Sequence, residues 1–204
     1  MPSRYSFTEY SSQWPDLFTA EAAVLQGILG VELVSIHHIG STAVPGLAAK
    51  PIIDLLPVVR NIGRIDELAS ALEAAGYKAY GEYGLPGRRY FTRDKGEYRT
   101  HNVHIFQQDD LDIERHLAFC AYLQAHVEAR QDYATLKREV YIQHPADIEA
   151  YNKSKDAWIK QAELTALEWY RDRVSQRDCG WPIHNQAAGI MPFVGHRREV
   201  YKRM

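Results

Sequence analysis

The sequence predicts an α/β (α+β) fold, in which about five strands are combined with helices and followed by a helical C-terminal half. Short β-rich segments alternate with helical patterns in the first half of the chain. From residue 111 onward, apolar residues recur at helical spacing. The 204 residues are 46% hydrophobic and 25% charged, which is typical of one folded domain.

Five segments carry the strand signal, a short run rich in β-branched and aromatic residues. They are residues 33–39, 52–59, 77–82, 88–93 and 99–106. The second is apolar enough to be buried on both faces. It contains Pro57, which cannot donate to a ladder and therefore indicates a strand end or a sheet edge. In the last segment Asn102, His104 and Phe106 alternate with Val103 and Ile105, so the two sets face opposite ways.

Helical signals occupy most of the remaining chain. Two helices are predicted early, over residues 14–29 and 65–75, and Gly76 is a natural stop for the second. Three further apolar stripes after residue 111 predict three more helices. Asp147 is a suitable N-cap for the last and longest of them.

The bulk properties disfavour several classes of protein. A formal net charge of −2 provides no global attraction to nucleic acid or to an anionic membrane. The N-terminal residues lack the apolar core of a signal peptide, and no uninterrupted apolar stretch is long enough to span a bilayer. Cys120 and Cys179 are far apart, so neither a disulfide framework nor a thiolate zinc site is indicated. The expected location is the reducing cytoplasm.

The most informative segment, residues 38–56, joins a Gly-Ser turn to a lone aspartate. Gly40 lets the backbone approach a ligand closely, and Ser41 and Thr42 can help the neighbouring amides to cradle a phosphate. Asp54 lies between apolar residues, where a buried charge left without its partner costs about 3–5 kcal/mol. The carboxylate therefore needs a cation, a basic side chain or a metal ion as its partner.

Basic residues are the candidates for binding a polyanion, and they are Lys50, Arg88, Arg99, Lys137 and Lys155. Arginine matches phosphate bidentately, whereas lysine acts as a point charge. Lys137 and Lys155 lie on or beside the apolar stripes of their helices, so they either point toward the sheet or extend to solvent. Each residue has an alternative role, which is to neutralise Asp54 or Glu82. A buried ion pair of Asp54 would explain the same residues without a ligand.

Glu82 and His104 are the candidates for completing a metal site with Asp54. One or two carboxylates, water and substrate phosphates can hold Mg²⁺, and Glu82 lies beside a glycine-containing turn. His104 as a ligand would favour Mn²⁺ or Zn²⁺. The alternatives are an ion pair of Glu82 with Arg88 or Arg89, and a histidine that only makes hydrogen bonds.

A Gly-Ser turn separated by twelve residues from an aspartate on a buried strand resembles the signature of the nucleotidyltransferase superfamily. Within that superfamily, the chain resembles the GrpB-like family over about residues 5–170, in segments 40–54, 82–91, 99–105, 116–119, 122–123, 136–137 and 151–155. The resemblance implies a nucleotidyltransferase-like mixed sheet in which the turn holds triphosphate and Asp54 holds Mg²⁺. Leu56 occupies the position of the superfamily's second carboxylate, so Asp54 alone cannot build a two-metal site.

Two functions follow as expectations. The first is a metal-dependent nucleotidyltransferase that uses a nucleoside triphosphate and an unknown acceptor, with Asp54 and Glu82 as catalytic residues. The alternative is a protein that binds a nucleotide or another phosphorylated metabolite without catalysis. A third and weaker hypothesis is a metal-dependent hydrolase built on His101, His104 and His116 with Asp54, although these histidines lack a known ligand spacing.

The domain organisation is predicted as one GrpB-like domain over residues 1–171 and an extension over residues 172–204. The extension has no sustained period but contains several large apolar residues. We therefore expect a docking arm or linker that contacts its own domain or a second copy of the chain. The expected partner is a small phosphorylated molecule, whereas nucleic acid and membranes are not expected.

Overall fold

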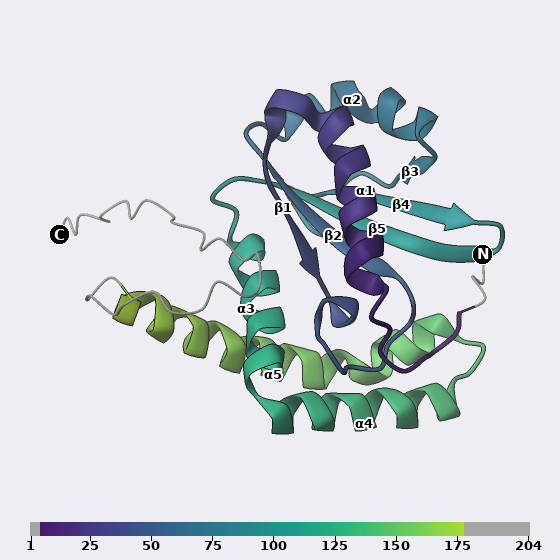
Figure 1. Ribbon diagram of the computed structural model, residues 1–204, viewed down its shortest axis with the longest axis vertical. Coiled ribbons are helices and arrows are strands. Elements are labelled where there is room, and N and C mark those ends of the chain that lie inside the picture. Colours follow the sequence, from purple (N-terminus) through teal and green to yellow (C-terminus); the bar gives the residue numbers. More distant parts are fainter. Residues whose placement is uncertain (1–4, 178–204) are drawn as a thin grey trace.

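A five-stranded sheet forms the centre of the computed structural model, which describes residues 5–177 (Figure 1). Five α-helices and two short 3₁₀ helices accompany the sheet within these residues. The elements follow in the order α1 (Trp14–Leu29), β1 (Leu33–Ile39), β2 (Ile53–Val59), α2 (Gly63–Ala74), β3 (Tyr77–Ala79), β4 (Arg89–Lys95), β5 (Tyr98–Gln107), α3 (Leu111–Ala125), α4 (Val127–Gln143) and α5 (Ile148–Arg177).

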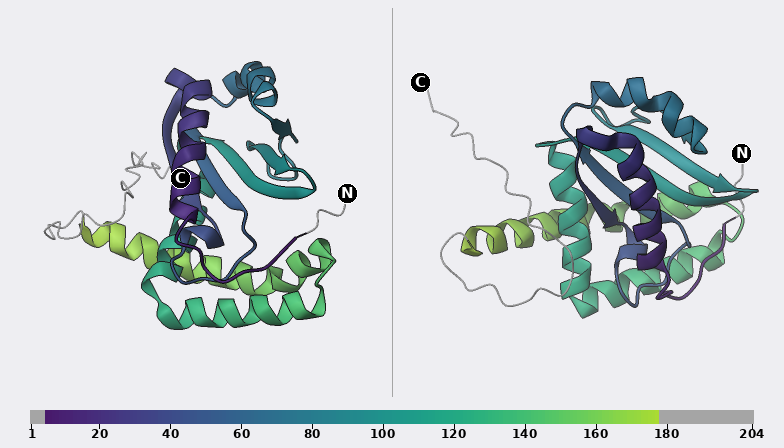
Figure 2. Two further views of the ribbon diagram at one scale, coloured as in Figure 1. Left: turned by 45° about the vertical axis from the view of Figure 1, so that its right-hand side comes forward. Right: turned by 45° about the horizontal axis from the view of Figure 1, so that its top comes forward.

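The sheet is mixed. Its strand order is β1-β2-β5-β4-β3, with β2 parallel to β5 and every other neighbouring pair antiparallel. Helices α1 and α2 cover one face, α3 packs on the other, and α4 and α5 run across one end of the sheet (Figures 1 and 2). The predicted fold class is therefore confirmed, including the helical second half.

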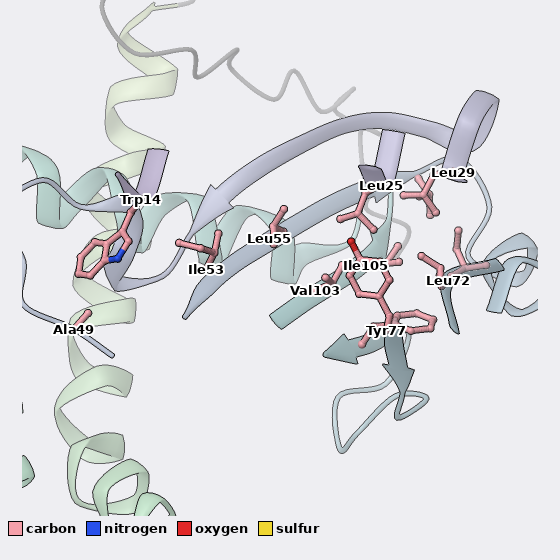
Figure 3. Packing of buried hydrophobic residues seen from close by; sticks show 13 residues of the cluster. Trp14, Leu25, Leu29, Ala49, Ile53, Leu55, Leu72, Tyr77, Val103 and Ile105 are labelled. Carbon is pink, nitrogen blue, oxygen red and sulfur yellow. The ribbon is translucent and has the colours of Figure 1, made fainter. Parts of the chain in front are cut away.

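Strand alternation divides the core between the two faces. Ile53 and Leu55 of β2 and Val103 and Ile105 of β5 pack against α1, where Leu25 is fully buried (Figure 3). The opposite face packs against α3 through the residues Leu56, Val58, Phe106, Ile113 and Leu117. The polar residues of β2 and β5 that alternate with the apolar residues facing α1 therefore point to the opposite face, toward α3.

Pro57 contradicts the expectation of a strand end or a sheet edge. It lies inside β2, which runs between β1 and β5, and it is paired with Ile36. On the other side, the pairing with β5 includes Leu55 and resumes at Val58. The ladder thus has a gap at the position where proline offers no donor, and this accommodates it in an interior strand.

Other element boundaries lie close to their predicted positions, with two differences. β3 is only three residues long rather than six, because the chain turns through positive φ angles at Gly81, Tyr83 and Gly84. α5 begins after Asp147, whose Oδ1 accepts hydrogen bonds from two following backbone amides. The helix continues to Arg177, across the predicted domain boundary at 171/172, which stays a prediction.

Residues 178–204, and with them most of the predicted docking extension and its role in self-association, lie outside the described residues. Within residues 5–177, no helix combines the length and the apolar character required to cross a membrane.

A buried polar network attaches α1 to the sheet. The carboxylate of Glu21 accepts hydrogen bonds from the Tyr77 hydroxyl at 2.6 Å and from the Arg93 guanidinium at 2.7 and 2.9 Å. Nε2 of His101 lies 3.8 Å from the same carboxylate. The side chain of Glu21 is only 7% exposed, so water cannot replace these partners.

We expect Glu21→Gln to lower the free energy of unfolding by about 2 kcal/mol, because hydrogen bonds to a charged group contribute roughly 1.5–3 kcal/mol. Urea denaturation measures the change. Glu73→Gln, on the exposed face of α2, is the matched control and should stay within about 0.5 kcal/mol of the wild type. Equal effects of the two substitutions would show that the network contributes no stability.

Candidate functional site

The Gly-Ser turn and Asp54 lie side by side, where β1 ends and β2 begins. Asp54 is the register partner of Ile39, the residue before Gly40. A Cβ atom on Gly40 would lie 2.4 Å from Oδ2 of Asp54. Gly40 also has φ 71° and ψ −168°, a backbone conformation restricted essentially to glycine. The turn and the carboxylate therefore form one site.

Neighbouring side chains hold the turn in place. The Thr42 hydroxyl donates to the carbonyl of Ile52 at 3.2 Å and lies 3.0 Å from Nε2 of His38. From α3, the Gln124 amide donates to the carbonyl of Ala43 at 2.9 Å. Thr42 is 1% exposed. Contrary to the expectation for Thr42, its hydroxyl faces the protein interior and supports the turn instead of facing a ligand.

Asp54 is held by a hydrogen-bonded chain from β4 and β5. Nδ2 of Asn102 donates to Oδ1 of Asp54 at 2.7 Å, and the Tyr90 hydroxyl donates to Oδ1 of Asn102 at 2.8 Å. The Asp54 side chain is 24% exposed, and no Lys or Arg within residues 5–177 forms an ion pair with it. Sequence reasoning missed both Asn102 and Tyr90. The available signal was that Asn102 shares a strand face with His104.

His104 stands on the other side of Asp54. Nη1 of Arg88 donates to Nδ1 of His104 at 3.2 Å, which assigns the ring proton to Nε2. Nε2 lies 3.8 Å from Oδ1 of Asp54. Because one ring nitrogen accepts from arginine and the other carries a proton, this histidine is not arranged as a metal ligand. Metal binding requires a ring nitrogen with a free lone pair, and neither ring nitrogen of His104 has one in this arrangement.

Arg88 and Glu82 serve the loop between β3 and β4. Arg88 is 8% exposed, and its guanidinium also donates to the carbonyls of Glu82 and Tyr83 at 3.2 and 2.8 Å. The Glu82 carboxylate accepts from the amide of Gly87 at 2.8 Å and lies 4.0 Å from Nη1 of Arg89. The loop folds back on itself and uses both residues internally, while their expected roles in phosphate and metal binding stay predictions.

The donors at this site do not fit a resident metal ion. Within residues 5–177, no group of three His, Cys, Asp or Glu side chains is placed to hold one. Asp54 has one oxygen already hydrogen-bonded, and the buried Leu56 stands where a second carboxylate is needed. Magnesium prefers an octahedral set of oxygen ligands, which these side chains cannot supply. We therefore assign no protein-held metal to the site.

The three histidines of the hydrolase hypothesis do not converge. His101 lies on the α1 face of the sheet beside Glu21. His104 points to the α3 face, where its ring centroid lies 5.5 Å from that of His116. Burial lowers the pKa of His116 well below its usual range, as do the nearby Arg115, His104 and Arg88. This ring is therefore neutral and enclosed.

Three lysines from separate segments converge on the Gly-Ser turn and Asp54. Lys137 of α4 donates from Nζ to Oγ of Ser41 at 3.0 Å. Nζ of Lys155 on α5 and Nζ of Lys50 lie 4.4 and 5.1 Å from the ring centroid of Tyr151. Lys137 is 2% exposed and Lys155 is 8% exposed, so both point inward rather than into solvent.

Burial and mutual repulsion disfavour the charged forms of the two buried lysines. Burial lowers the pKa of Lys137 to about 6, and Lys155 is the largest of the like charges that lower it further. Burial and Lys50 lower the pKa of Lys155 to about 7, while Asp54 opposes the shift. No ion pair within residues 5–177 includes Lys50, Lys137 or Lys155. An anion that entered the cluster would stabilise the charged lysines.

Comparisons with known proteins agree with this architecture. A crystal structure of the conserved protein GrpB from Enterococcus faecalis is 44% identical and has a TM-score of 0.78, over 81% of this chain and 99% of that one. The UPF0157 protein YqkA of Bacillus subtilis is 44% identical over 164 residues, which are 80% of this chain. They are only 48% of YqkA, so the chain spans about half the length of that relative.

A protein named dephospho-CoA kinase from Mycolicibacterium paratuberculosis is 30% identical over 183 residues, which cover 77% of this chain and 44% of that protein. The model of the family described as GrpB protein matches residues 5–164, which include the Gly-Ser turn, Asp54 and all three clustered lysines. The chain therefore belongs to the GrpB family.

Proposed function

We propose that this GrpB domain binds the phosphate chain of a nucleotide between the Gly-Ser turn and the three lysines, without a metal ion held by the protein. The observation that carries the proposal is the pair of buried lysines, Lys137 and Lys155, which form no ion pair with an acidic side chain within residues 5–177. Because buried charges require compensation, an anionic ligand would supply what the fold lacks.

Each part of the site has a role in this binding mode. The lysine ammonium groups donate to phosphate oxygens as charge-assisted hydrogen bonds. Gly40 lets the turn lie directly against Asp54, and Ser41, held by Lys137, offers its hydroxyl. Asn102 and His104 orient Asp54, whose second oxygen can accept a hydrogen bond from a hydroxyl of the ligand.

Metal-assisted nucleotidyl transfer is the second candidate. The observation in its favour is that Asp54 directs Oδ2 toward the Gly-Ser turn. A magnesium ion that arrives with the nucleotide would find one carboxylate oxygen there, together with the ligand's own phosphates. In that case ligand binding would depend on the metal, which separates this candidate from metal-free binding.

Thermal unfolding with ATP, in EDTA or in excess Mg²⁺, tests the two candidates. At a ligand concentration of about 100 times Kd, binding adds roughly 2.7 kcal/mol of stability. For a domain of this size that raises Tm by about 5–10 °C. We expect the increase to persist in EDTA. An increase that requires Mg²⁺, together with pyrophosphate release, would support transfer instead, and no increase under either condition would contradict both candidates.

The lysine pKa values also predict how anion binding depends on pH. Between about pH 7.5 and pH 8.5, Lys137 and Lys155 are largely neutral in the free protein and must take up protons when an anion binds. Affinity should therefore fall as pH rises through this range, by up to about tenfold per pH unit for each lysine. Below about pH 6 both groups are charged before binding, so affinity should level off.

Sulfate is the suitable probe, because it keeps the same charge throughout the range. Calorimetric titration at several pH values, in buffers of different ionisation enthalpy, measures both affinity and proton uptake. Lys137→Met should remove part of the uptake. Sulfate affinity that is unchanged or higher at pH of about 8.5 than at about 6 would contradict the role of these lysines.

A further inference from the structure

A cavity of about 250 Å³ lies next to the lysine cluster. The N-terminal segment, the loop before β2 and the first residues of β5 line it. Its principal lining side chains are Tyr5, Ser6, Lys50, Tyr98, Arg99 and Thr100. Lys50 belongs to both the cavity and the cluster, so a ligand held at the Gly-Ser turn can extend into this space.

The size of the cavity fits one end of a nucleotide. Sites that enclose a whole small-molecule ligand have volumes of about 300–1,000 Å³. The cavity volume is smaller, and the phosphate-binding residues Ser41, Lys137 and Lys155 are not among those that line it. The phosphates and the rest of the ligand would thus occupy neighbouring compartments that meet at Lys50.

The chemistry of the lining fits a planar heterocycle. Tyr5 and Tyr98 offer aromatic surfaces, and base–aromatic stacking tolerates any base because every base has a π face. Lys50 and Arg99 offer donors for ring nitrogens and carbonyls, while the hydroxyls of Ser6 and Thr100 can donate or accept. Arg99 is already paired with Asp94 at 2.7 Å, which leaves Lys50 as the cation without a carboxylate partner within residues 5–177.

We propose that this cavity binds the heteroaromatic base of a nucleotide whose phosphates are held at the Gly-Ser turn and the lysine cluster. The inference rests on the proposed function, and it assigns a binding place to the end of the same ligand that is remote from the phosphates. Lys50 lies at the boundary, where it faces the base on one side and the phosphates on the other. Nucleoside polyphosphates are therefore the ligand class, in preference to inorganic polyphosphate or a phosphorylated molecule without a ring.

A second aromatic surface near the site provides a matched control. Tyr83 is 64% exposed, has a φ of 46°, and stacks on Tyr90 with 5.1 Å between ring centroids. Tyr90 in turn bonds to Asn102 of the Asp54 chain. Tyr83 and Tyr98 are thus two exposed tyrosines beside the same site, but only Tyr98 lines the cavity.

Binding of ATP and of inorganic tripolyphosphate, both measured by calorimetry in EDTA, separates the base from the phosphates. We expect the wild type to bind ATP about tenfold more tightly than tripolyphosphate, which is within the range of base stacking on an aromatic side chain. Tyr98→Ala should reduce the ratio of ATP affinity to tripolyphosphate affinity to about one. Tyr98→Phe should keep the tenfold ratio, because the aromatic ring remains. Tyr83→Ala should keep it as well.

Each other result has a definite meaning. If wild-type ATP and tripolyphosphate bind equally, or if Tyr98→Ala keeps the tenfold ratio whatever Tyr83→Ala does, the base does not occupy the cavity and the inference is wrong. The proposed function would stand in both cases. If tripolyphosphate and ATP both fail to bind, the proposed function fails, and this inference fails with it.

Discussion

Replacing Lys137 by methionine is expected to weaken ATP binding about 100-fold, because a buried charge-assisted hydrogen bond contributes roughly 1.5–3 kcal/mol. The same change should make the free protein more stable. Lys137 is 2% exposed and lies against the ring of Tyr133, with 4.4 Å from Nζ to the centroid. Methionine has a similar length and flexibility, and it fills such a space without a charge.

The direction of the stability change follows from the pKa of Lys137. Burial lowers it to about 6 in the folded protein, against a value of about 10.5 for an unperturbed lysine. Between these values the unfolded chain binds a proton that the folded chain does not, so the free energy of unfolding falls as pH falls from about 10.5 to about 6. Below about pH 6 the penalty is complete and constant.

Lys137→Met removes this penalty. At a pH of about 7.5 we expect a gain on the order of 2 kcal/mol in the free energy of unfolding, after allowing for the lost contact with Ser41. The gain should shrink as pH approaches about 10. Urea denaturation of the ligand-free protein at several pH values measures it.

Lys153→Met is the matched control, because Lys153 is an exposed residue of α5. It should change neither stability nor ATP binding. A Lys137→Met variant that is less stable than the wild type would show that Lys137 has a structural role. A variant that binds ATP as tightly as the wild type would show that Lys137 does not bind phosphate.

Gly40→Ala should lower the free energy of unfolding by about 3–5 kcal/mol and abolish ATP binding. The backbone conformation at Gly40 costs an L-residue about 1–3 kcal/mol. In addition, the new methyl group would lie 2.4 Å from Oδ2 and 3.1 Å from Cγ of Asp54. Relieving that overlap moves the carboxylate away from Asn102 and disrupts a charge-assisted hydrogen bond.

Gly46→Ala isolates the contribution of the contact with Asp54. Gly46 also has a positive φ, of 79°, but a Cβ atom there would meet no other atom within 4 Å. We expect a loss of about 1–2 kcal/mol from backbone strain alone, with ATP binding preserved. Urea denaturation and ATP titration of both variants make the comparison. Similar effects at the two glycines would mean that the approach of Gly40 to Asp54 is unimportant.

Most elements of the fold could be predicted because their signals are local. The stripe beginning at Trp14 and the capping residue Asp147 act over one or two helical turns, and the structure places α1 and α5 accordingly. Pro57 misled the prediction, because the gap in the ladder that accommodates it depends on how β5 pairs with β2. That pairing joins segments more than forty residues apart and leaves no local signal.

The candidate site was predictable only in part, for the same reason. Glu82 stands beside a glycine-rich turn and has the right chemistry for a metal ligand. The turn, however, supplies its own donor, the amide of Gly87. Asn102 has less conspicuous chemistry, yet strand pairing places its amide on the carboxylate of Asp54. Residue type alone could not distinguish the two cases.

By itself, the sequence determined the mixed helix and strand content and the short link between Gly40 and Asp54, because hydrophobic period and turn chemistry act between near neighbours. Only the tertiary structure decided that Lys50, Lys137 and Lys155 meet at that link. The Nζ of Lys137 and the Oγ of Ser41 are joined across 96 positions of the chain. The energy of a charge depends on its burial and on the distance to its neighbours, and packing sets both.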